Sequence, residues 1–436
     1  MPIPLKPPSR TDPLNFPVFG MSWYGNAGNG LSLLAYCGGG GSARTGVNNA
    51  ILVKEPDGNT KRIDTGDNVG VALKIVQNPV SGNIFLMVAL GKTVERYNLP
   101  SCEKSGEIEV GGDGVNAINV NIMTNRLACG CENGEIKVYE ISDERFDAES
   151  LLFVCQGHTN TICSVDFSCR GDRIVSSAKD GTARVWQGED QIALLKCEVH
   201  GGSDEKKKKK PVPKGRKPPQ ILVRGCAFGE LEGRVVFTVA STRRGSAFLG
   251  RWVETPEGWE CERVEVSDVP ISAMSISSDG FLLALGSVSG SIILWGVENW
   301  RPIKTFKEVH DLPVTCIAAR PYDVPLMSDE DGLRFHAISA SADSRLGHLS
   351  LQPPPPKPAR PGSFGDWLKF FWNLGIKLFV LYLAIGNPLW QDTQERCSHT
   401  WARGIQLGKL EQVYECVLHE VLIAPESLPG VMVAPY

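Results

Sequence analysis

Short apolar stretches alternate with polar turns along most of this chain. From Phe16 to about Ser350, runs rich in small and β-branched residues are separated by turns of glycine, asparagine, aspartate and serine. Most repeating units end on a large aromatic residue. The pattern predicts short strands rather than helices. Units that recur at this length indicate a repeat fold, in which neighbouring units bury each other's apolar faces.

The clearest unit runs from Gly157 to Trp186. It opens with Gly-His, turns at Arg170-Gly171-Asp172 and again at Asp180-Gly181, and ends in Thr-Ala-Arg-Val-Trp. Aspartate suits the second turn, because its side chain can hydrogen-bond the backbone of that turn. The unit resembles a WD repeat, the four-stranded blade of a β-propeller.

Four side chains of this unit are spaced to meet in its interior, namely His158, Asp180, Ser176 and Trp186. We expect a buried hydrogen-bond chain across three strands that stabilises the blade. The alternative interpretation is an acid–base pair of His158 and Asp180, because perturbed pairs of this kind also occur at catalytic sites.

Six weaker copies complete the pattern: Phe16 to about Thr65, Val71–Tyr97, Val115–Tyr139, Val223–Trp252, Ile271–Trp295 and His310–Leu349. The aromatic strand ends are expected to be core residues: Tyr97, Tyr139, Trp186, Trp252 and Trp295. The sequence therefore predicts an all-β, seven-bladed WD-repeat β-propeller over residues 1–350, with residues 1–16 as a proline-rich lead-in.

A lysine- and proline-rich insertion, residues 201–219, separates the fourth and fifth units and contains Lys206–Lys210. A run of like charge repels itself, which indicates a solvated loop. Two alternatives stay open, a nuclear-import or nucleic-acid patch and a contact with anionic lipid. The formal net charge of the whole chain is only −4, so composition gives no general attraction to nucleic acid.

The composition changes after Ser350. Residues 351–366 are a proline-rich linker, and residues 367–386 are a mostly apolar stretch of the length that crosses a bilayer core. Aromatic residues crowd its ends, so we expect a single transmembrane helix, although Asn373 and Lys377 are costly inside a bilayer. A buried helix of a soluble domain is the alternative.

Residues 387–436 carry an amphipathic pattern that predicts a short, mostly helical tail. The proline-broken N-terminus does not read as a signal peptide, so we expect a cytosolic propeller and a lumenal tail. Cys397 and Cys416 lie near histidines of the tail at spacings that fit no structural zinc class, and a Cys397–Cys416 disulfide is the alternative. Most of the thirteen cysteines lie in apolar runs, which indicates buried free thiols.

One connection in the first unit is too long for a simple hairpin. Cys37–Asn49 reads Cys-Gly-Gly-Gly-Gly-Ser-Ala-Arg-Thr-Gly-Val-Asn-Asn, where two turn residues would suffice. Gly41 and Gly46 have the spacing of a phosphate-binding loop. That motif continues with lysine and a hydroxyl residue, whereas this chain has Val47 and Asn48, so it is excluded. Consecutive glycines with asparagine oxygens instead suit a cage of carbonyl oxygens around potassium.

This glycine-rich loop, in the first blade of a propeller followed by one membrane span, resembles the Sec-twelve family, whose animal members are called prolactin regulatory element-binding protein. The resemblance covers nearly the whole chain. It implies guanine-nucleotide exchange on the Sar-type small GTPase at the endoplasmic reticulum membrane, which starts COPII vesicle coat assembly. It also implies a potassium ion held by Asn49 and by backbone carbonyls of the loop.

The resemblance places the contact with the GTPase in residues 38–49, which we name the exchange loop. Its expected site residues are Gly38, Gly39, Gly40, Gly41, Thr45, Gly46, Val47, Asn48 and Asn49. Val47 stands where the family often has isoleucine. Exchange needs no covalent step, so no general acid, base or nucleophile is expected, and the expected partners include neither nucleic acid nor a small-molecule substrate.

Two other functions stay open. The first is a non-catalytic WD-repeat scaffold of the endoplasmic reticulum membrane that assists export of specific membrane cargo, as divergent plant relatives of the family do; the intact Gly38–Gly41 and Asn49 argue against it. The second is a DNA-binding regulator, suggested by the family name and by Lys206–Lys210. The predicted membrane span and the near-neutral charge weigh against it.

Overall fold

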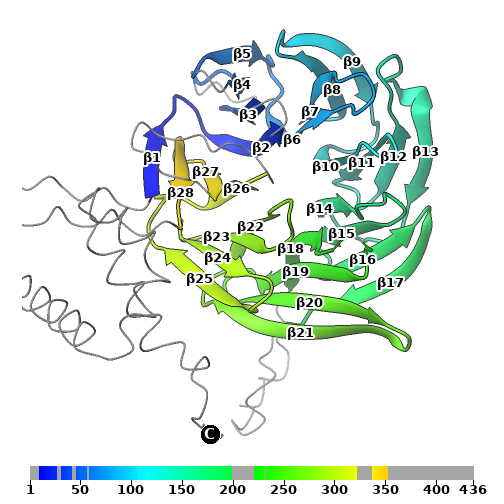
Figure 1. Cartoon of the computed structure of the whole chain (residues 1–436), viewed down its shortest axis with the longest axis vertical. Coiled ribbons are helices and arrows are strands. Elements are labelled where there is room, and N and C mark those ends of the chain that lie inside the picture. The colour runs from blue at the N-terminus through cyan, green and yellow to red at the C-terminus, as the bar shows by residue number, and fades with distance from the viewer. Residues whose placement is uncertain are drawn as a thin grey trace, which may run out of the picture. The chain divides into compact units, whose positions relative to one another are not determined.

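A computed structural model describes residues 9–26, 31–41, 46–55, 58–198, 220–230, 232–321 and 336–351. This part of the chain forms twenty-eight β-strands and one short 3-10 helix. The strands make seven four-stranded sheets, which Figure 1 shows arranged as blades around a central axis. The predicted all-β, seven-bladed WD-repeat propeller is confirmed for these residues.

The first three blades follow the order of the sequence. Blade one contains β2 (Val18–Asn26), β3 (Leu31–Gly38), β4 (Ala50–Lys54) and β5 (Thr60–Asp64). Blade two contains β6 (Gly70–Gln77), β7 (Ile84–Leu90), β8 (Thr93–Leu99) and β9 (Glu103–Glu109). Blade three contains β10 (Val115–Asn121), β11 (Arg126–Cys131), β12 (Ile136–Glu140), the 3-10 helix η1 (Ala148–Ser150) and β13 (Leu151–Cys155).

Blades four to six also consist of consecutive strands, whereas blade seven takes its outermost strand from the N-terminal segment. Blade four contains β14 (Ile162–Phe167), β15 (Ile174–Ala178), β16 (Thr182–Gln187) and β17 (Asp190–Lys196). Blade five contains β18 (Ile221–Phe228), β19 (Val235–Thr242), β20 (Ala247–Thr255) and β21 (Gly258–Ser267). Blade six contains β22 (Ile271–Ile276), β23 (Leu282–Ser287), β24 (Ile292–Gly296) and β25 (Arg301–Phe306). Blade seven contains β26 (Val314–Ala319), β27 (Ala337–Ser341), β28 (Arg345–Leu349) and β1 (Ser9–Pro13).

The innermost strand of every blade carries an irregularity at the same place. Its register with the second strand shifts close to its start, for example between Val18 and Gly20 in blade one and between Ile162 and Ser164 in blade four. The other blades repeat the shift. Because a bulge increases the local twist of a strand, its repetition gives all inner strands a similar course beside the axis.

The N-terminal segment closes the ring. Strand β1 pairs with β28 through the antiparallel register from Ser9 with Leu349 to Pro13 with Arg345, and Figure 1 shows the two strands side by side. The prediction that residues 1–16 are only a lead-in was therefore wrong for residues 9–13. Closure by the other end of the chain covers a sheet edge that would otherwise expose unpaired backbone groups.

The apolar core lies between the blades. In the described residues, buried apolar side chains form seven clusters, and each cluster joins two neighbouring blades. The predicted aromatic core residues are all buried within them: Tyr97, Tyr139, Trp186, Trp252 and Trp295. No blade can bury its faces alone, which is the physical reason for the repeat.

The antiparallel strand order decides which connections share a face. The connection from the second to the third strand of a blade lies on the same side as the connection to the next blade. Backbone hydrogen bonds confirm this for blade one, where Thr65 donates to Asn49 at 3.3 Å. We name this side the loop face. Strand β28 runs away from it, so the described chain ends on the opposite side.

Several predicted segments lie outside the described residues: the insertion 201–219, the linker 351–366 after Leu351, the transmembrane helix 367–386 and the tail 387–436 with Cys397 and Cys416. Within the ranges that the structure describes, no helix has the length and apolar character to cross a membrane. The propeller belongs to one compact unit, Met1–Pro354.

Candidate functional site

The exchange loop leaves the sheet of blade one between β3 and β4 on the loop face. The base of the loop is held by backbone hydrogen bonds. The Gly39 amide donates to the Pro17 carbonyl at 3.0 Å, and the Gly40 amide donates to the Val47 carbonyl at 3.3 Å. Pro17 directly precedes the innermost strand, so the loop is anchored to the inner edge of the blade as well as to its own strands.

Asn49 closes the loop from its C-terminal end. The residue is only 3% exposed. Its Oδ1 accepts a hydrogen bond from the Gly41 amide at 2.9 Å, while its Nδ2 donates to the Gly41 carbonyl at 3.2 Å and to the Gly66 carbonyl at 2.9 Å. These partners fix the orientation of the amide. In the reversed orientation the side-chain oxygen would face two carbonyl oxygens and the NH₂ group would face the Gly41 amide. Asn49 thus joins the glycine run to a second connection of the loop face.

The glycines serve two different physical needs. A Cβ at Gly38 would overlap the Pro17 carbonyl, and a Cβ at Gly39 would overlap the Asn49 side chain. Gly41 and Gly46 have open space around them but adopt φ values of +72° and +76°, which L-residues with side chains rarely take. Gly38 is therefore required for close approach and Gly41 and Gly46 for backbone conformation, while Gly39, with a φ of +141°, meets both needs.

The remaining predicted site residues divide by exposure. Gly46 and Asn48 are exposed, and Val47 is half-buried against the cluster between blades one and seven. Val47 thus contributes to packing, which the sequence did not predict. Thr45 lies outside the described residues. The structure brings Gly38–Gly41 and Val47–Asn49 together at one base.

Sequence reasoning missed the turn that follows β5. The Thr65 amide donates to the Asn49 carbonyl at 3.3 Å, and the Thr65 hydroxyl donates to the Asn68 carbonyl at 2.7 Å. Gly66, whose carbonyl accepts from Asn49, has a φ of +60°. The sequence Thr-Gly-Asp-Asn is an ordinary turn signal, so only the contact with Asn49 marks this turn as part of the site.

Cys37 lies beneath the loop, at the end of β3. Its thiol occupies space left by two glycines: a Cβ at Gly20 would lie 2.9 Å from the sulfur, and one at Gly70 would lie 2.7 Å from it. Burial raises the pKa of Cys37 well above its ordinary value, and the neighbouring Cys316 thiol adds to the shift. The protonated thiol is a packing group and not a nucleophile. The cysteines of the described residues are free thiols.

The oxygens around Asn49 are of the neutral kind found in potassium sites, and in this structure they are engaged in hydrogen bonds with the loop and the following turn. The Asn49 Oδ1 and the carbonyls of Gly41 and Gly66 are neutral oxygens gathered around one buried side chain. Such oxygens suit a weakly hydrated monovalent cation. Each oxygen has two lone pairs, so a single hydrogen bond leaves it able to face a cation as well.

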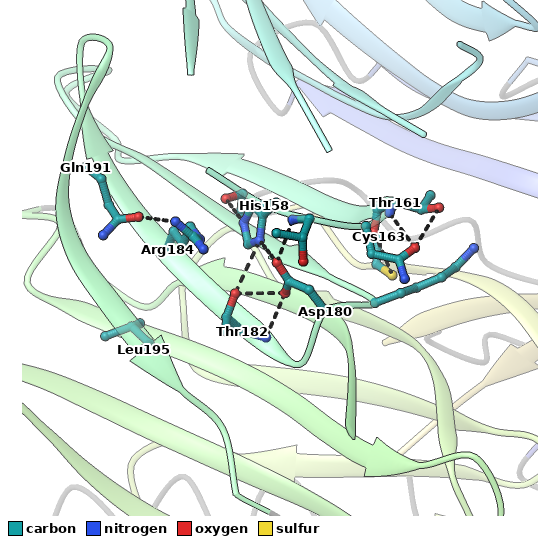
Figure 2. A network of polar contacts seen from close by, with 12 residues as sticks. His158, Thr161, Cys163, Asp180, Thr182, Arg184, Gln191 and Leu195 are labelled. Carbon is teal, nitrogen blue, oxygen red and sulfur yellow. Dashed lines mark hydrogen bonds and ion pairs between the residues drawn. The ribbon is translucent and has the colours of Figure 1, made fainter. Parts of the chain in front are cut away.

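Figure 2 shows a second polar arrangement, the network of blade four, in which His158, Asp180 and Thr182 converge. His158 Nδ1 lies 2.8 Å from Asp180 Oδ2, and its Nε2 lies 2.9 Å from Ser176 Oγ. The Trp186 indole donates to the same Ser176 oxygen at 2.8 Å. The predicted hydrogen-bond chain is confirmed.

The surroundings of His158 and Asp180 agree with a structural role. Burial by itself would raise the pKa of Asp180, but the hydrogen bond and charge of His158, together with the bonds from Thr182, hold that pKa well below its ordinary value. Both His158 ring nitrogens are engaged, and the side chain is fully buried. A substrate cannot reach this pair without breaking the blade, which argues against the acid–base interpretation.

Other blades keep only parts of this network. In blade seven, His310 lies 3.1 Å from Asp343 and 2.9 Å from Ser339, a copy that the sequence did not predict. Leu349 takes the place of the tryptophan there, because it pairs with Ala337 as Trp186 pairs with Ile174. In blade six, the buried Trp295 indole nitrogen has no hydrogen-bond partner among the described residues.

Known proteins match this chain as a WD-repeat protein. The family "WD domain, G-beta repeat" matches residues 149–187, which contain the outermost strand of blade three and the first three strands of blade four. Angio-associated migratory cell protein of Homo sapiens is 23% identical over 233 residues, or 53% of this chain and 46% of that protein. Target of rapamycin complex subunit wat1 of Schizosaccharomyces pombe is 24% identical over 167 residues, or 38% of this chain and 44% of that protein.

A third relative matches a shorter segment at higher identity. Periodic tryptophan protein 2 of Saccharomyces cerevisiae is 32% identical over 91 residues, which are 21% of this chain and 9% of that protein. The chain spans about half the length, or less, of the curated relatives it matches. The similarity supports the repeat and the fold, and the activities of those proteins belong to their whole chains.

Proposed function

Because this chain is a WD-repeat β-propeller protein, we propose that the propeller serves as the rigid base of one specialised loop, and that the chain is a guanine-nucleotide exchange factor for a Sar-type small GTPase. The buried Asn49 carries the proposal. This asparagine ties the run of glycines to the turn between blades one and two and so holds the loop in one conformation. A simple hairpin between β3 and β4 would need none of this.

The proposed mechanism is differential binding. A GTPase holds its nucleotide with backbone amides, Mg²⁺ and switch segments. An exchange factor must bind the nucleotide-free form more tightly than the loaded form, because equal affinity for both shifts nothing. A loop that is already fixed at its base loses little conformational entropy when it contacts a switch segment, so more of the contact energy contributes to binding. The exposed Gly46 and Asn48 are the described residues that face solvent for this contact.

Potassium is a proposed cofactor of the loop. Asn49 and the carbonyls of Gly41 and Gly66 would hold it, and the ion would supply a positive charge that orients neutral oxygens. The protein residues already close the loop base by hydrogen bonds. We therefore expect potassium to strengthen the loop rather than to create it.

The membrane is the second proposed partner. Residues 367–386 would anchor the chain in the endoplasmic reticulum membrane, with the propeller in the cytosol and residues 387–436 in the lumen. Activation of the GTPase at that membrane would start assembly of the COPII vesicle coat. The proposed reaction is a non-covalent exchange without an acid, a base or a nucleophile.

Release of fluorescent GDP from a purified Sar-type GTPase tests the proposal. Residues 1–360, which contain the whole propeller, are added in potassium buffer and then in sodium buffer. We expect release to accelerate with the protein in potassium and to accelerate less in sodium. Release no faster than that of the GTPase alone would contradict the exchange function. Equal acceleration in both buffers would contradict only the role of potassium.

A second candidate is a non-catalytic scaffold of the endoplasmic reticulum membrane that assists export of specific membrane cargo. The similarity to a protein whose name describes a complex subunit favours this class in general terms. The two candidates separate in one comparison. A scaffold would leave GDP release unchanged and would retain specific membrane cargo when the full chain is purified in detergent.

A further inference from the structure

The proposed exchange element contains a second segment that does not belong to the exchange loop. We propose that the Thr65–Asn68 turn, between blades one and two, is a positioning element that fixes the exchange loop through Asn49. The inference rests on the proposed function for its effect on exchange. Its effect on the loop itself can be measured separately.

Two contacts connect the turn to Asn49. The Thr65 amide donates to the Asn49 backbone carbonyl at 3.3 Å, and the Gly66 carbonyl accepts from the Asn49 side chain at 2.9 Å. The turn therefore holds both the backbone and the amide group of the same buried residue. The amide in turn holds Gly41 by two bonds. A continuous path runs from the turn through Asn49 to the glycine run.

Two hydrogen bonds within the turn stabilise its conformation. The Thr65 hydroxyl donates to the Asn68 carbonyl at 2.7 Å, and the Asn68 amide donates to the Thr65 carbonyl at 3.3 Å. These bonds set the direction of the Gly66 carbonyl, which lies between them in the chain. Asn49 is 3% exposed, so water cannot easily replace the Gly66 carbonyl if it turns away. A small change in the turn therefore reaches Gly41.

The position of the turn in the fold also suits this role. The turn joins β5 to β6, so its ends belong to two blades that pack against each other through a buried cluster. Asp67 and Asn68 are exposed on the loop face. The turn is thus rigid where it meets Asn49 and accessible on its other side, which is the arrangement expected of a support for a working loop.

The test is Thr65→Val in the full chain, which removes the hydroxyl and keeps the branched shape. One readout is amide hydrogen exchange of a peptide that spans Gly38–Asn49, and the other is release of fluorescent GDP from the Sar-type GTPase. Loss of one hydrogen bond predicts exchange of these amides about fivefold faster and GDP release about fivefold slower. Gly66→Ala, which disfavours the left-handed turn without filling occupied space, should act in the same direction.

The matched control is Thr255→Val in blade five. The Thr255 hydroxyl donates to the carbonyl three residues later, Gly258, at 3.0 Å, as the Thr65 hydroxyl does to Asn68. This control should leave both readouts of the exchange loop unchanged. A general loss of stability by removal of a turn hydroxyl would affect both variants alike.

The outcomes separate the two proposals. Unchanged amide exchange in Gly38–Asn49 after Thr65→Val would overturn the positioning role, and so would a loosened loop with undiminished GDP release. In a third outcome, the wild-type protein fails to accelerate GDP release from the GTPase while Thr65→Val still loosens the loop. That result would overturn the exchange function and leave the support of the loop by the turn standing. Loosening together with slower release would support both.

Discussion

Blades one and four use the same connection, between the second and third strands, in opposite ways. In blade four only three residues, Lys179 to Gly181, join β15 to β16, and Asp180 turns inward to bond His158. In blade one the connection is the exchange loop, and Asn49 turns inward to bond Gly41 and Gly66. Both connections place a buried polar side chain at the rim of a blade.

The difference lies in what the buried group holds. Asp180 and its partners tie together strands of one sheet, so the energy of the network stabilises the blade. Asn49 ties a loop to itself and to a neighbouring turn, so its bonds shape a surface that contributes little to the core. Buried polar groups cost free energy unless they are paired, which makes both arrangements specific. The comparison predicts that variants of blade four affect stability and that variants of blade one affect activity.

The largest expected effect on activity comes from Asn49→Ala. The change removes the three hydrogen bonds by which the buried Asn49 side chain holds Gly41 and Gly66. GDP release should slow by at least about tenfold, the kinetic equivalent of 1.4 kcal/mol. The propeller should keep its circular dichroism spectrum and its cooperative unfolding.

Asn133→Ala is the matched control for this variant. Asn133 lies in the corresponding turn of blade three, is exposed, and accepts a bond only within its turn, from the Glu135 amide at 3.0 Å. GDP release should not change. An equal loss of release in both variants would remove the distinction between Asn49 and an ordinary turn asparagine.

Gly39→Ala and Gly41→Ala sharpen the comparison within the exchange loop. A Cβ at Gly39 overlaps the Asn49 side chain, so Gly39→Ala should slow GDP release nearly as much as Asn49→Ala. Gly41 has open space, so Gly41→Ala costs only the left-handed conformation, about 1–2 kcal/mol. The effect of Gly41→Ala should be the smaller one. The reverse order would mean that the loop does not depend on its packing against Asn49.

Blade four can be compared with blade seven by Ser176→Ala and Ser339→Ala. Loss of the Ser176 hydroxyl leaves His158 Nε2 and the Trp186 indole nitrogen without a partner. Loss of the Ser339 hydroxyl removes the partner of His310 Nε2 and involves no tryptophan. Ser176→Ala should lower the free energy of unfolding by about 1–3 kcal/mol more, the cost of one extra unpaired buried group. Urea unfolding measures the difference. Equal losses would show that the Trp186 bond contributes nothing.

The smallest predicted effect is a pH dependence at His310. Burial lowers the pKa of His310, and the positive charge of Arg345 lowers it further. The carboxylates of Asp343 and Asp311 raise the pKa, but the net shift is downward. Above the unfolded value of about 6.5 both states are neutral. As the pH falls below that value, the unfolded chain takes up a proton that the folded chain does not, so stability falls.

His310→Gln removes this titration. The urea midpoint of the wild type should therefore fall more between pH 7.5 and pH 5.5 than that of the variant. Parallel midpoints over this range would show that His310 does not contribute to the acid sensitivity of the propeller.

The fold could be predicted from local patterns to a large extent. Gly157-His158, Asp180-Gly181 and Trp186 marked one blade, and the spacing of aromatic strand ends marked the others. The strand formed by residues 9–13 was not predicted, because it has no distinctive pattern of its own. It pairs with β28, which lies more than three hundred residues away in the sequence. The His310 network escaped for a related reason, since Leu349 replaces the tryptophan that made its equivalent in blade four recognisable.

The sequence by itself determined the repeat, the seven blades and the unusual loop, because strand periodicity, turn residues and runs of glycine are local properties of a chain. Only the tertiary structure decided what Asn49 touches. Its partner Gly66 lies seventeen residues away, and the bond exists because the antiparallel order of blade one brings two connections to one face. Sequence proximity could single out the exchange loop, and three-dimensional contact was needed to identify the turn that supports it.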